Sequence, residues 1–207
     1  MVLRSATLTL IVGTCYTIMH KALQAFVPSR SRSAGMSAVT TGLWIAATLA
    51  LVYFAGAFLK EVRPQDRVLQ CSLVAIMVFT SVVILAKLPV AGALATGIGH
   101  RLAFGGASTL NAVALLVFAI SLARHLPAGS SILAPLRLLA WGLGLTVLLG
   151  LAASGYMVIY LTTGRGIAPL PFLQPLAILS FIFTSAMTLW FLARFRRIDN
   201  YAALVHR

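Results

Sequence analysis

The chain has 207 residues, of which 60% are hydrophobic and only 9% charged, whereas about 25% of an ordinary soluble domain is charged. This composition excludes a soluble domain with a single core. The net charge is +13, from 16 lysines and arginines against three acidic residues. Because the basic residues lie in short segments between apolar stretches, they indicate membrane topology and a lipid bilayer as partner, and not a nucleic acid.

Six stretches are long and apolar enough to cross a bilayer, for which a helix needs about 20 predominantly apolar residues. They cover 5–26, 38–59, 69–90, 103–123, 138–161 and 171–193. The sequence therefore predicts an all-α, polytopic integral membrane protein with six transmembrane helices in one bundle. Residues 1–207 form a single transmembrane domain in this prediction.

The first span, 5–26, is the most polar of the six. At helical spacing, one side of it carries a stripe of polar and small residues: Thr9, Gly13, Tyr16, Thr17, His20 and Gln24. A helix with this stripe cannot face lipid all round, so we expect it to pack against other spans. We expect its threonines and tyrosine, and Asn111 of the fourth span, to form hydrogen bonds between helices.

Small residues recur in the second and fifth spans. Gly42, Ala46 and Ala50 repeat at every fourth position of the second span. The fifth span contains Gly142, Gly144, Gly150, Ser154 and Gly155. Rows of small residues let helix backbones approach closely. Both spans are therefore expected to make close helix contacts, within the bundle or with other subunits.

The connection 91–108 is rich in glycine and alanine and contains His100 and Arg101. It fits either a re-entrant segment around 93–103 or a simple loop. We favour the loop, because non-helical backbone at membrane depth must be buried in protein or face water.

Six spans place both termini on the same side of a membrane. Six of the 16 basic side chains then lie on the opposite, outward side: Lys21, Arg30, Arg32, Lys87, Arg101 and Arg165. The remaining ten lie on the side of the termini, so the positive-inside rule predicts that both termini are cytoplasmic. We expect the chain in the bacterial cytoplasmic (inner) membrane.

Acidic residues are absent from the predicted spans, since Glu61, Asp66 and Asp199 all lie outside them. Proton- and sodium-coupled transporters usually hold an intramembrane carboxylate. Its absence argues against such coupling, against a carboxylate-ligated metal site and against catalysis by paired carboxylates. The sequence contains no Ser-His-Asp set, phosphate-binding loop or HExxH motif. We therefore expect a protein without catalytic activity.

The outward face is basic and carries no acid, so it creates a positive potential that attracts an anionic ligand, a lipid headgroup or an acidic partner. The candidate ligand site lies at the outward end of the first span, with basic residues from other elements: His20, Lys21, Tyr16, Thr17, Lys87 and Arg101. The simpler interpretation is that the two lysines extend to the lipid headgroups.

These features predict a permease or the integral subunit of a larger membrane complex. No cofactor is predicted, and the partners are other membrane subunits or a second copy of the chain. One alternative is an electron-transfer anchor that binds haem b through His20 and His100, or a quinone through His20. Another is a membrane sensor or assembly factor with a lipophilic ligand in a groove of the first span.

Overall fold

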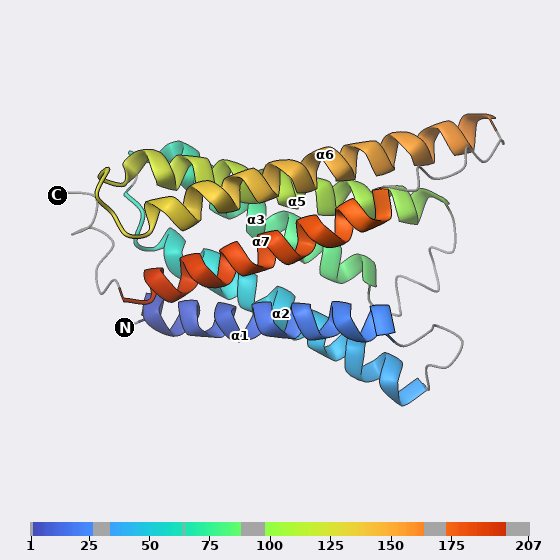
Figure 1. The fold of residues 1–207 in the computed structure, drawn as a ribbon, viewed down its shortest axis with the longest axis horizontal. Helices are drawn as coiled ribbons and strands as arrows, with labels where there is room; N and C mark the ends of the chain where they lie inside the picture. The colour runs from blue at the N-terminus through green and yellow to red at the C-terminus, as the bar shows by residue number, and fades with distance from the viewer. Residues whose placement is uncertain (1, 27–33, 64, 88–97, 164–172, 198–207) are drawn as a thin grey trace.

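The computed structural model describes residues 2–26, 34–63, 65–87, 98–163 and 173–197 (Figure 1). Their helices are α1 (Val2–Phe26), α2 (Ala34–Leu59), α3 (Arg67–Lys87), α5 (Ile98–His125), α6 (Leu133–Thr163) and α7 (Leu173–Phe195). Each contains an apolar stretch of 20 to 24 residues, which is long enough to cross a bilayer. Within the described residues, the predicted architecture of six long apolar helices is confirmed, and it supports a multi-pass membrane protein.

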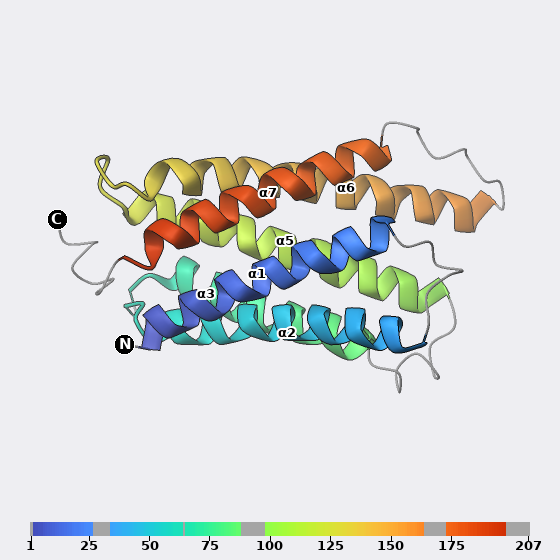
Figure 2. The ribbon, with the colours of Figure 1, turned by 60° about the horizontal axis from the view of Figure 1, so that its bottom comes forward.

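The six helices form a ring in which successive helices run in opposite directions (Figures 1 and 2). Each helix packs against the helices before and after it in the sequence, and α7 closes the ring against α1. The contact between α1 and α7 is the least extensive of these six. Helix α1 begins and α7 ends at the same end of the bundle, which we call the terminal end.

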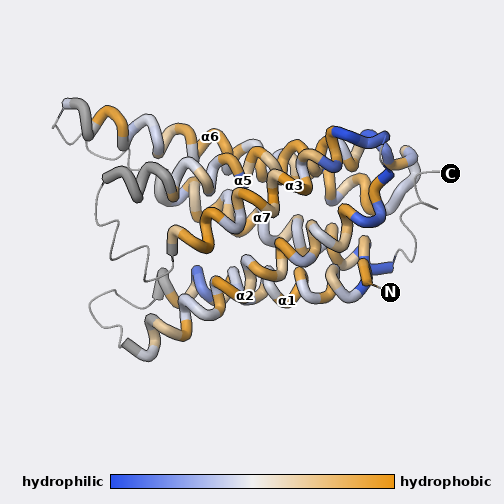
Figure 3. Tube along the Cα trace, turned by 180° about the vertical axis from the view of Figure 1, so that it is seen from behind, coloured by the Kyte–Doolittle hydropathy of each residue, from blue (hydrophilic) through white to orange (hydrophobic). Residues whose placement is uncertain are grey.

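The outside of the bundle is apolar along most of its length. Figure 3 shows hydrophilic residues gathered at the terminal end and hydrophobic residues over the middle of the helices. Leu85, Leu148 and Leu179 are each at least 60% exposed on this surface. Such an extensive exposed apolar surface is unfavourable in water, whereas lipid chains solvate it.

Five of the six helices begin earlier than predicted, and α5 and α6 do so by five residues each. Helix α5 begins at Ile98 and not at 103, so the predicted loop was wrong for residues 98–102, and 91–97 lie outside the described residues. No proline follows in this stretch, and isolated glycines weaken a helix without ending it. Helix α6 begins at Leu133 and not at 138, because Pro135 lies in its first turn, where a missing N–H costs no intrahelical hydrogen bond.

The core of the bundle is concentrated near the terminal end. We call residues 2–13, 47–76, 112–148 and 185–197 the terminal half, and the other described residues the far half. All but Thr80 of the largest fully buried side chains belong to the terminal half: Phe58, Phe195, Leu69, Leu73, Ile76, Leu122, Ile132, Leu136, Leu192, Thr7 and Pro135. Close packing of large side chains therefore joins the helices mainly at this end.

Five phenylalanines of α2, α5 and α7 form an aromatic cluster within the terminal half: Phe54, Phe58, Phe118, Phe191 and Phe195. The ring of Phe58 lies at the centre of this cluster, with ring centroids of Phe118 and Phe195 each 5.5 Å away. Aromatic pairs at these separations attract one another beyond the burial of their surface. The cluster fills the interior of the ring near the terminal end.

Glycine permits the closest approach between α1 and α2. A β-carbon at Gly13 would lie 2.8 Å from the β-carbon of Ala50 and 3.2 Å from the backbone oxygen of Ala47. The contact predicted for the small residues of α2 thus holds at Ala50. Gly42 and Ala46 are exposed and therefore do not take part in this contact, so for them a contact with another subunit stays a prediction. In α6, Gly142 and Gly150 make the expected close contacts with neighbouring helices.

Candidate functional site

A cavity of about 470 Å³ lies inside the ring and is lined by side chains of all six helices. Small-molecule sites have volumes of about 300–1,000 Å³. Toward the terminal end, the cavity is bounded by Phe54, Phe118 and Phe191 of the aromatic cluster. Polar lining residues lie within two residues of the midpoints of five helices: Thr14, Thr48, Asn111, Thr146 and Thr184. The cavity therefore occupies the middle of the bundle.

The lining combines apolar and aromatic surface with hydroxyl groups. Nine hydroxyl side chains line the cavity: Thr14, Thr17, Thr48, Ser108, Thr146, Ser180, Thr184, Ser185 and Thr188. Among the described residues, no side chain that carries a charge at neutral pH lines it. A site of this kind suits a molecule with an apolar body and a few hydrogen-bonding groups, since specificity comes from a small number of polar contacts.

Most of these hydroxyl groups already donate a hydrogen bond within the protein. Five threonines donate it to the backbone carbonyl four residues earlier in the same helix: Thr14, Thr17, Thr48, Thr146 and Thr188. Ser180 lies 3.1 Å from the Thr146 hydroxyl and must donate to it, because Thr146 has no second hydrogen. The threonine oxygens can then only accept hydrogen bonds from a bound molecule.

Asn111 brings a different polar group to the same wall. Its Oδ1 accepts a hydrogen bond of 3.1 Å from the Thr80 hydroxyl, which joins α3 to α5 and confirms the interhelical bond predicted for Asn111. The Asn111 amide N–H₂ has no partner among the described residues and can donate to a ligand. For Thr7, Thr9, Thr14 and Thr17 the interhelical prediction was wrong, because their hydroxyls find a nearer acceptor in their own helix.

Thr184 provides an unsatisfied hydroxyl in the lining. Its Oγ1 is buried and has no hydrogen-bond partner within the described part of the chain. It lies beside α6, where a β-carbon on Gly142 would come within 2.7 Å of it. Leaving a buried hydroxyl unpaired costs about 1–3 kcal/mol, and a bound molecule that hydrogen-bonds to Thr184 would remove this cost.

The residues of the predicted site on α1 have different surroundings. Thr17 lines the central cavity, and Tyr16 is half-buried. His20 is only 4% exposed, and its Nδ1 lies 2.9 Å from the backbone oxygen of Thr40 on α2. Lys21 is exposed on the surface of α1. The polar stripe of the first span thus turns Thr17 and His20 inward, whereas Thr9, another member, is exposed.

The residues that other helices were predicted to add to the sites at the outward end of α1 stay predictions. Lys87 is the last residue of α3, and His100 and Arg101 lie in the first turn of α5, but their side chains lie outside the described structure. Both helix ends belong to the end of the bundle opposite the termini, as does the end of α1 that carries His20 and Lys21.

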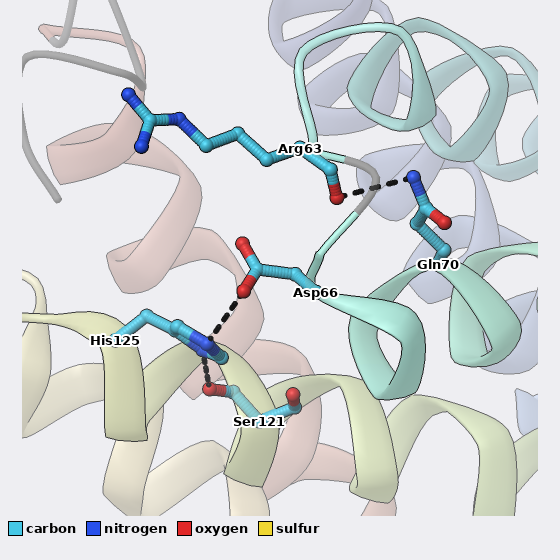
Figure 4. Close-up of polar contacts among 5 residues, drawn as sticks. All are labelled: Arg63, Asp66, Gln70, Ser121 and His125. Atoms are coloured by element: carbon cyan, nitrogen blue, oxygen red, sulfur yellow. Dashed lines mark hydrogen bonds and ion pairs between the residues drawn. The ribbon is translucent and has the colours of Figure 1, made fainter.

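An ion pair lies on the terminal side of the bundle (Figure 4). His125 Nε2 at the end of α5 is 3.1 Å from Asp66 Oδ1, which precedes α3. The other ring nitrogen, Nδ1, lies 2.7 Å from the backbone oxygen of Ser121. Asp66 and His125 therefore link the α2–α3 turn to α5, at a distance from the cavity.

No family model, curated protein or solved structure matches this chain. Of the cavity residues, the sequence predicted Thr17 as a ligand-binding residue and Asn111 only as an interhelical hydrogen-bonding residue. The hydroxyl residues of α6 and α7, Thr146, Ser180 and Thr184, were not predicted. Their signal in the sequence was the presence of single serines and threonines near the middle of otherwise apolar spans.

Proposed function

We propose that this protein is a membrane permease whose central cavity binds a small uncharged molecule that donates hydrogen bonds. The observation that carries the proposal is a cavity lined by all six helices, with hydroxyl groups and without a charged side chain among the described residues. Transporters bind their substrates near the bilayer midplane, between helices. The position of the polar lining residues near the helix midpoints agrees with such a site.

The expected charge of the substrate follows from the lining. An ion taken into this cavity would lose its hydration without meeting an opposite charge, which is strongly unfavourable inside a membrane. The threonine oxygens offer acceptors to N–H and O–H groups of a neutral molecule, and Asn111 offers a donor. We therefore favour uncharged molecules that combine an apolar face with hydroxyl or amide groups.

The aromatic cluster argues for a carrier and against an open channel. It closes the interior of the ring on the terminal side of the cavity. A bound molecule can leave toward that side only after the helices that contribute the cluster have moved, as alternating access requires. In our proposal the termini lie in the cytoplasm of a bacterial cell and the cluster is the cytoplasmic barrier.

Uptake into liposomes tests this proposal. Purified protein is reconstituted, and entry of radiolabelled thymidine and glycerol, which are uncharged and carry hydroxyl groups, is compared with entry of the anion thymidine 5′-monophosphate. We expect faster entry of at least one uncharged probe than in protein-free liposomes, and no such effect for the anion. If neither uncharged probe enters faster, or if the anion does, the proposal is wrong.

A matched pair of variants connects uptake to the cavity. Ala112 lines the cavity, whereas its neighbour Val113 is exposed on the outside of α5. Ala112→Trp should fill the cavity and reduce uptake to the rate of protein-free liposomes. Val113→Trp adds the same side chain on the lipid side and should leave uptake unchanged. Equal uptake by both variants would exclude the cavity as the route.

The electron-transfer anchor stays a second candidate because of His20. This histidine is buried, and its Nδ1 faces a backbone carbonyl, an arrangement that also orients imidazoles for binding a metal through Nε2. An absorption spectrum of the purified protein, oxidised and reduced with dithionite, tests it. A Soret band with sharp reduced α and β bands would support haem b, and a featureless visible spectrum after expression with ample haem would remove the haem candidate.

A further inference from the structure

A second pocket lies at the terminal end, on the seam where α7 closes the ring against α1. Its volume is about 420 Å³, and it is lined by Arg4, Leu8, Arg196 and Arg197. Arg4 lies in the first turn of α1, and the other two arginines directly follow α7. This seam is the least extensive of the six contacts that close the ring.

The three guanidinium groups of this pocket form a concentrated positive site. None of them forms an ion pair with a carboxylate in the described part of the chain, where Asp66 pairs with His125. The first turn of α1 adds the partial positive charge of a helix N-terminus. Like charges around one pocket repel one another, and an anion bound between them would reduce the repulsion.

The backbone holds two of these arginines in place. The N–H of Arg196 donates to the Leu192 carbonyl at 2.9 Å, and the N–H of Arg197 donates to the Arg194 carbonyl at 3.2 Å. Leu192 is fully buried in the core. Both residues therefore continue the last turn of a well-packed helix, so the position of their α-carbons beside α1 is fixed by the fold.

The fourth lining residue indicates what kind of anion fits. Leu8 lies one turn beyond Arg4 on α1 and is 44% exposed, and Val12 continues the same apolar stripe one turn further. A molecule with its anionic group at the arginines would lay any attached apolar chain along this stripe. Guanidinium groups bind phosphate with paired hydrogen bonds, and basic pockets between helices at a membrane surface bind phospholipid headgroups.

We propose that this pocket binds the phosphate group of an anionic phospholipid, whose acyl chains lie along Leu8 and Val12. The lipid bridges the first and last helices at the least extensive contact of the ring. This site is separate from the central cavity and does not depend on the transport proposal.

Native mass spectrometry of the detergent-purified full chain tests the site with phosphatidylglycerol as probe and phosphatidylcholine as the zwitterionic reference. The pocket variant combines Arg4→Gln, Arg196→Gln and Arg197→Gln. Its matched control combines Arg63→Gln, Arg124→Gln and Arg137→Gln, which removes the same charge from exposed positions near the terminal end. Both variants are first compared with wild type by size-exclusion chromatography and thermal unfolding.

We expect wild type and the control to retain phosphatidylglycerol in preference to phosphatidylcholine. The pocket variant should bind phosphatidylglycerol at least about tenfold more weakly, since each of the three arginines contributes to headgroup attraction. Equal binding by the pocket variant and wild type, or an equal loss in both variants, would overturn the proposal, because the pocket would then have no role beyond net charge.

Titration with inorganic phosphate separates a lipid site from a site for a free anion. If the lipid is the ligand, inorganic phosphate should displace phosphatidylglycerol only at concentrations far above those of the lipid, because it lacks the contact with Leu8. Leu8→Gln should then weaken lipid binding and leave phosphate binding unchanged. If phosphate displaces the lipid at equal concentration and Leu8→Gln has no effect, the pocket binds a free anion and the lipid proposal is wrong.

Discussion

The two halves of the bundle are built from different side chains. Every buried leucine, isoleucine and phenylalanine among the described residues lies in the terminal half, whereas the far half buries fewer and mostly smaller residues, such as Thr40, Thr80 and Ser180. In Figure 1, α2 and α6 diverge from the terminal end toward the far end. This contrast shows how one ring of helices can be packed firmly at one end and keep room for a ligand in its middle.

The largest effect should come from the core of the terminal half. Leu192→Ala on α7 removes a fully buried side chain, so it should lower the free energy of unfolding by about 2–5 kcal/mol. Leu179→Ala is the matched control on the same helix, since Leu179 is 62% exposed. Reversible unfolding in sodium dodecyl sulfate measures both. If both variants lowered the free energy of unfolding by a similar amount, the assignment of the core to the terminal half would be wrong.

The close contact between α1 and α2 predicts the next effect. Gly13→Ala places a β-carbon against backbone atoms of Ala47, which cannot turn aside, so it should destabilise the fold by about 1–3 kcal/mol. Gly42→Ala meets nothing within 4 Å and should stabilise α2 by up to about 1 kcal/mol through helix propensity. The same unfolding assay measures both variants. Changes of opposite sign in the free energy of unfolding would separate the effect of packing from that of helix propensity.

Two threonines near the cavity should respond oppositely to the same substitution. Thr80→Val leaves the Asn111 Oδ1 without its hydrogen-bond donor and should cost about 1–3 kcal/mol of unfolding free energy. Thr184→Val removes a buried hydroxyl that has no described partner, and should stabilise the empty protein by about 1 kcal/mol while weakening uptake of the uncharged probe. A loss of stability in Thr184→Val would show that this hydroxyl is satisfied.

The smallest effect is expected from the ion pair. Asp66 and His125 are partly exposed, so Asp66→Asn should reduce the free energy of unfolding by less than about 1 kcal/mol. A double-mutant cycle with His125→Gln isolates the interaction between the two side chains. A coupling as large as the effect of Leu192→Ala would mean that charge pairing, and not apolar packing, holds the terminal half together.

Much of the fold follows from the sequence alone. Uninterrupted apolar stretches of about 20 residues determine where helices form, because a backbone in lipid must satisfy its hydrogen bonds within the helix. Helix ends were less predictable. The fifth helix was predicted to begin at 138, although α6 begins at Leu133 with Pro135 in its first turn, and the fourth was predicted to begin at 103, although α5 begins at Ile98.

The candidate site could be predicted only in part. The polar stripe of α1 indicated an inward face, and Thr17 and His20 do face inward. The sequence drew attention to charges and histidines, because these are rare in membrane spans. Single threonines and serines are common there, and a threonine such as Thr146 can donate to a carbonyl of its own helix, so such residues give no sign of a shared cavity.

The sequence by itself determined that this chain forms six apolar helices with its acidic residues outside them, since hydropathy and length are local properties. The tertiary structure alone decided that the helices close into a ring, that Thr184 and Asn111 line one cavity, and that Arg4 and Arg197 share one pocket. Those pairs are separated by more than seventy residues along the chain. Their proximity depends on how residues such as Gly13 and Phe58 pack between helices, which no local pattern encodes.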